Sequence, residues 1–207
     1  MNLHGARGAR PGRRRITLAV VASAVVLAVS LAACGAPDSL AQQARAGDNK
    51  NYIAGDGSVS EYAAGDRQSP VSFQAPLFNG QVVESASFAG KVVVLNFWYA
   101  ACGPCRLEAG TLQELSQSFQ GKGAEFYGVN IRDEAPTAAA YERTFGVTYP
   151  SFYDRSGGVL LAMASFVPPQ AVPTTIVLDK QGRVAARILG VADKSTLKSL
   201  ISDTLAN

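Results

Sequence analysis

The stretch KVVVLNFWYAACGPCRLE, residues 91–108, decides the fold of this chain. Residues 91–98 form a nearly continuous run of β-branched and aromatic side chains, which predicts a central strand buried on both faces. Two cysteines, Cys102 and Cys105, follow directly. Apolar residues then recur at helical spacing to about residue 120, where Gly121 predicts the end of a helix. The stretch therefore predicts a strand-to-helix junction that carries two thiols.

A thiol at such a junction has the chemistry of a disulfide exchange centre. The free N–H groups and the positive dipole end of a helix favour a thiolate. We expect Cys102, partly exposed at the mouth of the helix, to attack, and Cys105, one turn further in and more buried, to resolve. Pro104 suits the first turn because its missing N–H would have had no partner there. Gly103 would let another backbone approach closely.

Three other uses of the two cysteines are weaker. Zinc needs about four ligands, yet the chain has three cysteines and its only histidine is His4, near the N-terminus. A Cys-His hydrolase fails for the same lack of histidine. A structural disulfide is possible, but so short a loop constrains the unfolded chain little. Redox exchange is the favoured interpretation, and no metal ligand set is predicted.

The rest of the chain predicts an α/β domain over residues 67–207 with a mixed central sheet flanked by helices. The Asn79-Gly80 pair between two apolar runs predicts an N-terminal β-hairpin. Other expected elements are a strand at 124–131, a helix at 137–146 between Pro136 and Gly146, a hairpin of strands 174–179 and 184–190, and a helix at 193–205 capped by Asp193.

The first 33 residues predict an export signal. Five arginines and no acidic residue precede position 34, and an apolar run ends in LAAC at residues 31–34. That ending resembles the bacterial lipobox, which would make Cys34 the lipid-carrying first residue of the mature protein. An ordinary signal-peptidase cut and a retained membrane anchor stay open as alternatives. The positive charge would remain in the cytoplasm, with the rest of the chain on the extracytoplasmic side of the cell membrane.

Residues 34–66 are rich in small and polar side chains and show no period, which predicts a flexible tether. Of the 19 basic residues five lie in the leader, so the rest of the chain carries 14 against 16 acidic residues, a net charge of −2. A body of this charge is a poor partner for nucleic acid. The segment RDE at 132–134 is expected to be a solvated loop.

The motifs FWYAACGPC and, some seventy residues later, VPTT together resemble a thioredoxin-like domain. The resemblance implies that the Val172–Pro173 bond is cis, that Pro173 faces the cysteines, and that the backbone at Val172 pairs with a substrate strand. It also implies that no cofactor is used beyond a redox-active Cys102–Cys105 disulfide. The sequence by itself would equally allow an ordinary trans proline at 173.

A closer resemblance is to the exported TlpA/ResA branch of thioredoxin-like thiol-disulfide oxidoreductases, over about residues 70–205. It includes GKVVVLNFW, CGPCRLE, VPTTIVLDKQGRVAARILG and an insertion before Pro173. The resemblance implies that Glu108 is an acid near the site, able to accept the proton of the resolving thiol, and that Asn96 stands where thioredoxin has a buried acid. A plain surface glutamate is the alternative for Glu108. The substrate-contacting residues implied by the resemblance are Trp98, Gly103, Pro104, Val172 and Thr174.

This sequence departs from the branch at Ala101, where a tryptophan is usual, and at Gly110, where a helix-kinking proline is often found. Both departures concern substrate contacts rather than the redox pair. The expected function is a membrane-tethered disulfide reductase that receives electrons from a membrane thiol donor and acts on exported proteins, with apocytochrome c as the substrate class of the branch. An oxidase that forms disulfides is the main alternative. A thiol peroxidase and a copper chaperone fit less well, since the motif and the histidine that they need are missing.

Overall fold

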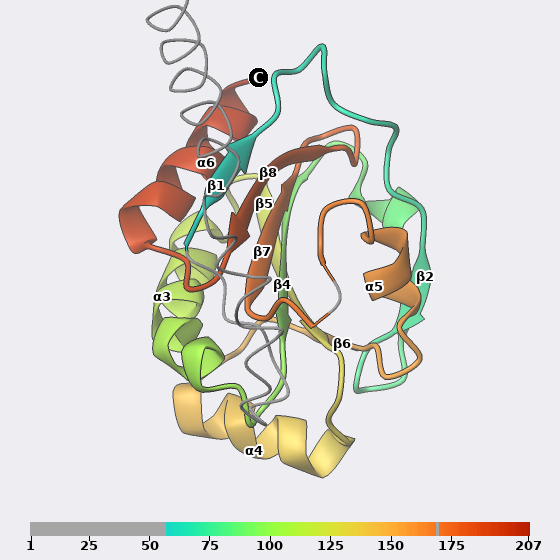
Figure 1. Cartoon of the computed structure of the whole chain (residues 1–207), viewed down its shortest axis with the longest axis vertical. Helices are drawn as coiled ribbons and strands as arrows, with labels where there is room; N and C mark the ends of the chain where they lie inside the picture. The colour runs from blue at the N-terminus through green and yellow to red at the C-terminus, as the bar shows by residue number, and fades with distance from the viewer. Residues whose placement is uncertain (1–56, 169) are drawn as a thin grey trace, which may run out of the picture. The chain divides into compact units, whose positions relative to one another are not determined.

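The computed structural model describes residues 57–168 and 170–207, and a single six-stranded sheet organises them (Figure 1). The strand order is β1-β8-β7-β4-β5-β6. β4 pairs in parallel with β5 and antiparallel with β7, so the sheet is mixed. The strands of this sheet are β1 (Val59–Glu61), β4 (Val92–Trp98), β5 (Ala124–Asn130), β6 (Ser151–Tyr153), β7 (Thr174–Leu178) and β8 (Val184–Leu189).

Strand β4 is central, and all seven of its residues are buried. Because side chains alternate across a strand, Val92 and Val94 contribute to one apolar cluster, while Val93, Leu95 and Phe97 contribute to the other. Both faces of the sheet therefore need a cover, which explains why residues 92–95 are apolar without alternation.

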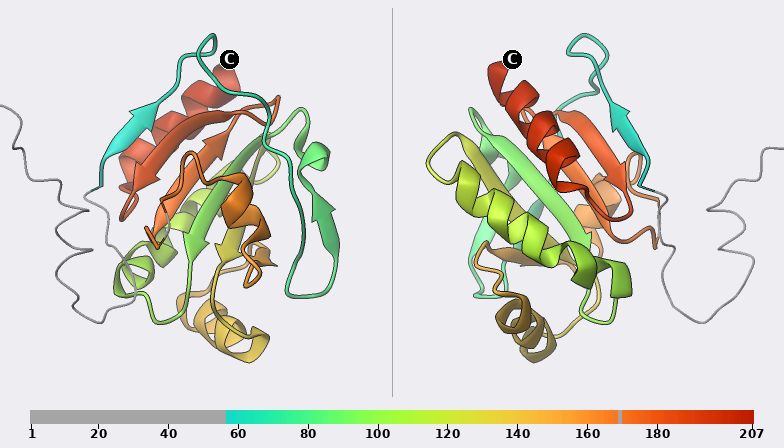
Figure 2. Two further views of the ribbon diagram at one scale, coloured as in Figure 1. Left: turned by 45° about the vertical axis from the view of Figure 1, so that its right-hand side comes forward. Right: turned by 90° about the vertical axis from the view of Figure 1, so that its left-hand side faces the viewer.

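Two layers supply that cover (Figure 2). Helices α3 (Gly103–Phe119) and α6 (Lys194–Ala206) pack on one face through Leu112, Leu115 and Leu197. On the other face lie helix α5 (Gly158–Ala162) and the separate hairpin of β2 (Gln74–Pro76) and β3 (Val82–Glu84), followed by the 3-10 helix η2 (Ser85–Phe88). Helix α4 (Ala135–Phe145) lies beyond the carboxyl ends of β4 and β5 (Figure 1).

The structure confirms the predicted α/β fold and its main elements. The Asn79-Gly80 hairpin is β2–β3, with Gly80 in the positive-φ conformation that such a turn requires. Helix α4 begins at Ala135, with Pro136 in its first turn, and ends against the left-handed Gly146. Asp193 caps α6 by accepting a hydrogen bond from the Thr196 N–H.

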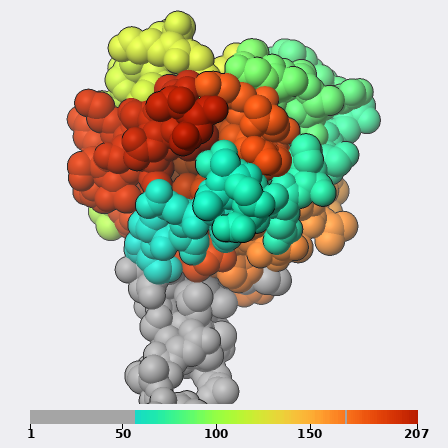
Figure 3. Space-filling model, turned by 90° about the horizontal axis from the view of Figure 1, so that it is seen from above, coloured from blue at the N-terminus to red at the C-terminus, as the bar shows by residue number. Residues whose placement is uncertain are grey.

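The N-terminal boundary of the domain differs from the prediction. Residues 59–61, assigned to the tether, form strand β1, which pairs antiparallel with β8 from Val59–Ile188 to Glu61–Ala186. A three-residue edge strand is too short to show a period, so its sequence resembles a linker. Further along, the side chain of Arg67 donates to Asp179 at 2.9 Å (side-chain exposures 8% and 3%) and fixes this segment to the β7–β8 turn. Figure 3 shows the segment lying across that side of the domain.

The segment between β5 and β7 forms α4, β6 and α5. No strand or helix was predicted at β6 or α5. Asp154, three residues before the N-cap Gly157, accepts hydrogen bonds from the N–H groups of Val159 and Leu160 in the first turn of α5.

Within the described ranges, no helix is long and apolar enough to cross a membrane. The predicted signal peptide, Cys34 and the tether up to residue 56 lie outside the described residues.

Candidate active site

One edge of the sheet gathers the residues that the sequence singled out. Phe97, near the end of β4, is paired with Thr174, the first residue of β7. Thr174 is in turn paired with Leu189, the last residue of β8. The Cys102 segment, the Pro173 segment and the loop after β8 therefore leave or enter the sheet at the same edge.

The two cysteines form a disulfide at the start of α3, with their Cα atoms 5.3 Å apart. Cys102 is the N-cap residue of α3, and its Sγ accepts a hydrogen bond from the Cys105 N–H at 3.2 Å. A sulfur in this position faces the unpaired N–H groups of the helix, which stabilise negative charge on it. The arrangement favours a thiolate at Cys102 once the disulfide is reduced.

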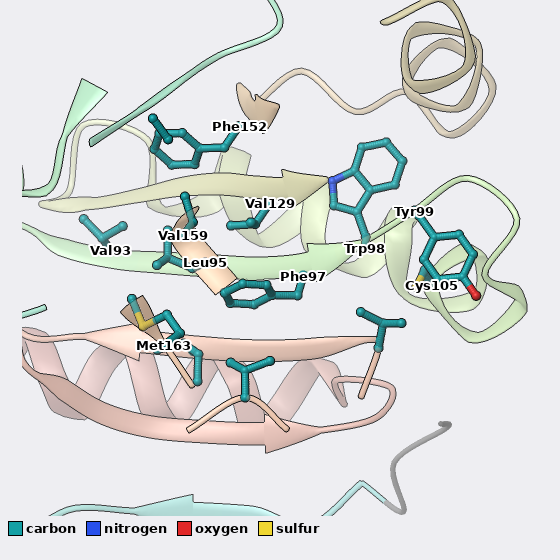
Figure 4. Packing of buried hydrophobic residues seen from close by; sticks show 14 of the residues in the cluster. Val93, Leu95, Phe97, Trp98, Tyr99, Cys105, Val129, Phe152, Val159 and Met163 are labelled. Atoms are coloured by element: carbon teal, nitrogen blue, oxygen red, sulfur yellow. The ribbon is translucent and has the colours of Figure 1, made fainter. Parts of the chain in front are cut away.

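The expected partial exposure of Cys102 is wrong for this disulfide form. Cys102 is 0% exposed and Cys105 is 1% exposed. Both belong to an apolar cluster that includes Tyr99 and Ala100, and Figure 4 labels Tyr99 and Cys105 among the residues of that cluster. Gly103 is exposed and Pro104 is half-buried.

The Val172–Pro173 peptide bond is cis, as the resemblance implied. Val172 is 1% exposed, and the carbonyl oxygen of Pro173 accepts from the Gly190 N–H at 2.8 Å. The Thr174 side chain is also buried, and its hydroxyl donates to the Ala171 carbonyl at 2.6 Å. The Thr174 side chain thus braces the loop from within rather than facing a substrate, contrary to the expectation for it.

Glu108 is buried, which overturns the alternative of a plain surface glutamate. Its side chain leaves α3 toward β4 and the loop before α6, and the residue is 1% exposed. Oε1 accepts from Asn96 Nδ2 at 2.7 Å and Oε2 from the Ala192 N–H at 2.8 Å. Burial raises the pKa of Glu108 to about 7, and the two hydrogen bonds oppose that rise only in part. This carboxyl therefore exchanges a proton near neutral pH.

Trp98 lies in the core and not on the surface, so its side chain does not take the substrate-contacting place that was expected of it. It is 3% exposed and its ring stacks on Tyr141 of α4, with ring centroids 4.3 Å apart. Tyr141 also donates its hydroxyl to the Cys105 carbonyl at 2.8 Å. The sequence carried no signal for this bond, because it joins two helices across 36 positions of the chain.

The RDE segment at 132–134 is more than the solvated loop that was expected. Asp133 Oδ2 accepts from the Ala100 N–H at 2.6 Å and from Asn130 Nδ2 at 2.8 Å. The guanidinium of Arg132 lies 4.3 Å from the centroid of the Tyr99 ring. Both residues hold the short segment that leads from β4 to Cys102.

Among residues 57–168 and 170–207, no group of three or more His, Cys, Asp or Glu side chains could hold a metal ion. The groups described at this edge of the sheet are the disulfide, the buried carboxyl of Glu108 and the cis-proline loop.

Comparisons with known proteins agree with this site. The Redoxin family model matches residues 63–201. The chain is 36% identical over 111 residues to the thiol-disulfide oxidoreductase ResA of Geobacillus thermodenitrificans, a match that covers 54% of this chain and 62% of that protein. With ResA of Bacillus subtilis it is 29% identical over 119 residues, 58% of this chain and 64% of that one. The chain thus spans about six-tenths of the length of these relatives.

Solved structures extend the likeness. A DsbF homologue from Corynebacterium diphtheriae has 34% identity and a TM-score of 0.63, covering 72% of this chain and 94% of that one. A secreted thiol-disulfide isomerase from Corynebacterium glutamicum has 29% identity and a TM-score of 0.65, covering 73% and 95%. These matches confirm the thioredoxin-like fold, and the chain belongs to the redoxin family.

Proposed function

We propose that this protein is a thiol-disulfide oxidoreductase that works outside the cytoplasm. The observation that carries the proposal is the Cys102–Cys105 disulfide at the N-cap of α3, at the sheet edge where the cis Val172–Pro173 bond leads into β7. Its similarity to ResA and to a secreted thiol-disulfide isomerase supports the same activity.

In the reducing direction, the Cys102 thiolate attacks one sulfur of a substrate disulfide. A bond forms between Cys102 Sγ and that sulfur, the substrate S–S bond breaks, and the second substrate sulfur leaves as a thiolate. Cys105 then gives up its proton and attacks Cys102 Sγ, which forms the enzyme disulfide and releases the first substrate sulfur. Two electrons pass from the enzyme to the substrate.

Glu108 is positioned to serve the second step. It lies three residues after Cys105 on α3, on the same helix face. With a pKa of about 7 its carboxyl is partly ionised at neutral pH, so it can accept the proton that Cys105 must lose. Asn96 holds one carboxyl oxygen and the Ala192 N–H the other, which fixes its orientation.

The biological role that fits best is reduction of apocytochrome c before haem attachment. The similarity of this chain to ResA supports this role. Reduction of apocytochrome c is the role that the resemblance to the TlpA/ResA branch implies. A membrane thiol donor would return electrons to Cys102 and Cys105, since the space outside the membrane has no thiol buffer. Lipid on Cys34 and a tether would keep the domain beside that donor.

The direction of electron flow is tested by the reduction potential of the Cys102–Cys105 pair, measured against glutathione and dithiothreitol buffers. A value near roughly −270 mV, as in thioredoxin, would support reduction, whereas a value near roughly −120 mV would mark a disulfide-forming oxidase. Radiolabelled fatty acid incorporation by the full chain, lost in Cys34→Ala, tests the lipid anchor.

A second candidate function is formation or rearrangement of disulfides in exported proteins. It is favoured by the likeness to the secreted isomerase of Corynebacterium glutamicum and to the DsbF homologue. Refolding of reduced, unfolded ribonuclease tests this function. A disulfide-forming protein, added in its oxidised form, should speed the refolding, whereas a reductase that is kept reduced should slow it.

A further inference from the structure

A groove of about 310 Å³ lies between Ala100 and Arg106, on either side of the start of α3, and one side of α4. Its lining includes Ala100, Arg106, Ala140, Tyr141, Thr144 and Phe145. The volume is at the lower end of roughly 300–1,000 Å³ for ligand sites. It therefore suits one or two side chains of a polypeptide better than a cofactor.

One hydrogen bond and two neighbouring sequence positions connect the lining of this groove to the two cysteines. Ala100 is two residues before Cys102, and Arg106 directly follows Cys105. Tyr141, on the α4 side, donates its hydroxyl to the Cys105 carbonyl at 2.8 Å. A polypeptide whose disulfide meets Cys102 would therefore place its neighbouring side chains at the mouth of the groove.

Arg106 is the charged group of the groove. Its Nε donates to the Ala100 carbonyl at 2.9 Å, which fixes the plane of the guanidinium. Its two Nη groups donate to no acceptor in the part of the chain that the structure describes. None of the described residues that line the groove is acidic. The nearby carboxylates are already engaged, Glu108 by Asn96 and Ala192, and Asp133 by Ala100 and Asn130.

We propose that this groove is a specificity subsite, in which Arg106 recognises an acidic side chain close to the target cysteine of a substrate polypeptide. A guanidinium held by Nε presents its Nη groups as a fork that matches a carboxylate. The apolar side of the groove, Tyr141 and Phe145, accommodates the methylene groups of a glutamate. The inference rests on the proposed oxidoreductase activity and adds to it a preferred substrate sequence.

The test uses short peptides with one cysteine, activated as a mixed disulfide with neutral pyridine-2-thiol. One set carries glutamate at each of the three positions before or after the cysteine, and a matched set carries glutamine there. Reduced protein is mixed with each peptide. Attack of Cys102 Sγ on the peptide sulfur breaks the S–S bond and releases pyridine-2-thione, whose absorbance gives the second-order rate constant.

We expect the glutamate peptide to react about fivefold faster than its glutamine partner at the best position, at low ionic strength. Arg106→Met should bring this ratio close to one, and Arg106→Glu should reverse it. The ratio is the decisive quantity, since both peptides meet the same thiol and any change in the reactivity of Cys102 cancels. Arg143→Met is the matched control, because Arg143 is exposed on α4 and outside the groove lining, and it should keep the wild-type ratio.

The outcomes separate this inference from the proposed function. If the wild-type protein reduces the neutral 2-hydroxyethyl disulfide but shows equal rates for glutamate and glutamine peptides at every position, the subsite is wrong and the oxidoreductase stands. Loss of the preference in Arg143→Met as strongly as in Arg106→Met would also overturn it, since general charge would then explain the preference. Failure to react with any disulfide overturns the proposed function and the subsite together.

Discussion

Glu108 combines deep burial with a titration near neutral pH. The pKa of its carboxyl is raised from 4.5 to about 7, chiefly by burial. Between these two values the folded protein binds more protons than the unfolded chain, so the free energy of unfolding falls as the pH rises. The loss of unfolding free energy that comes from ionising the buried Glu108 is complete above about pH 7, and it amounts to about 3 kcal/mol for a pKa shift of this size. Below pH 4.5 it is absent.

We expect Glu108→Gln to remove this dependence on pH. In the variant the glutamine NH2 group replaces the carboxylate oxygen that accepts from the Ala192 N–H, so this hydrogen bond is lost. The loss costs about 1 kcal/mol. The variant's free energy of unfolding, relative to wild type, should nevertheless improve by about 3 kcal/mol between pH 4.5 and pH 8. Denaturant unfolding of both oxidised proteins across this range measures the difference.

Using the oxidised form keeps the thiols from titrating, and subtraction of the two curves cancels the other ionisable groups. Parallel curves for wild type and Glu108→Gln would contradict the raised pKa. The same variant should slow the resolving step at neutral pH, seen as a longer-lived mixed disulfide with substrate, because Cys105 then lacks its proton acceptor.

The two cysteines have different roles, and serine at each should separate them. Cys102→Ser should lose disulfide reduction by roughly a thousandfold or more, because the attacking sulfur is gone. Cys105→Ser should lose turnover by a similar factor but accumulate a mixed disulfide between Cys102 and the substrate. Non-reducing gels and intact mass measurements detect that species. Accumulation in Cys102→Ser, or turnover that survives either change, would reject the assigned order of attack.

At the scale of elements, residues of the loop before α4 hold the segment between β4 and α3 in place. Asp133, in the loop before α4, accepts the Ala100 N–H and the Asn130 side chain on one oxygen, Oδ2. Ala100 is 8% exposed and Asn130 is fully buried, so the loss of this acceptor would leave two enclosed donors unpaired. Arg132 covers Tyr99 from the same loop. The position of Cys102 therefore depends on a loop that follows a different strand.

We expect Asp133→Ala to reduce the free energy of unfolding by about 2 kcal/mol, since two donors lose their partner. Asp133→Asn should cost under about 1 kcal/mol, because one amide oxygen can still accept from both. In the reduced protein, Asp133→Ala should also raise the rate of iodoacetamide reaction at Cys102, since the segment that encloses it is released. Equal stabilities of the alanine and asparagine variants would show that the acceptor oxygen is not what matters.

The sequence predicted those elements whose signal is local. The apolar run at 92–98, the Asn79-Gly80 turn and the cap at Asp193 each show their structure within a few residues, and each was confirmed. Family resemblance added the cis bond at Pro173, which no local pattern distinguishes from trans.

Features that depend on distant contacts could not be predicted. The Tyr141 hydroxyl meets the Cys105 carbonyl only after α3 and α4 have packed. The family resemblance implied that Trp98 contacts a substrate, but its ring stacks on Tyr141 of α4 in the core. Burial of Cys102 likewise follows from the packing of the Tyr99–Ala100 segment. An acid at an exposed-looking position such as Asp133 gives no sign in the sequence that it accepts a backbone N–H 33 residues away.

At the scale of the whole molecule, strand β1 decides where the folded domain begins. Strand β1 adds an edge to the sheet through the Leu189 N–H to Ser58 carbonyl bond at 3.0 Å and the Tyr62 N–H to Ala185 carbonyl bond at 2.9 Å. Tyr62 also packs edge-on against Phe166. The folded domain therefore includes residues 59–61, which the sequence had assigned to the tether.

We expect a protein that begins at residue 57 to be more stable than one that begins at residue 67, by on the order of 2 kcal/mol. The shorter protein lacks the β1–β8 hydrogen bonds and the Tyr62–Phe166 contact, and it exposes the edge of β8. Denaturant unfolding of the two oxidised proteins measures the difference, with a larger m-value for the longer one because more surface is buried. A third protein, starting at residue 57 with Tyr62→Ala, divides the effect between the aromatic contact and the strand. Equal stabilities for the proteins starting at 57 and 67 would show that residues 57–66 do not stabilise the folded domain.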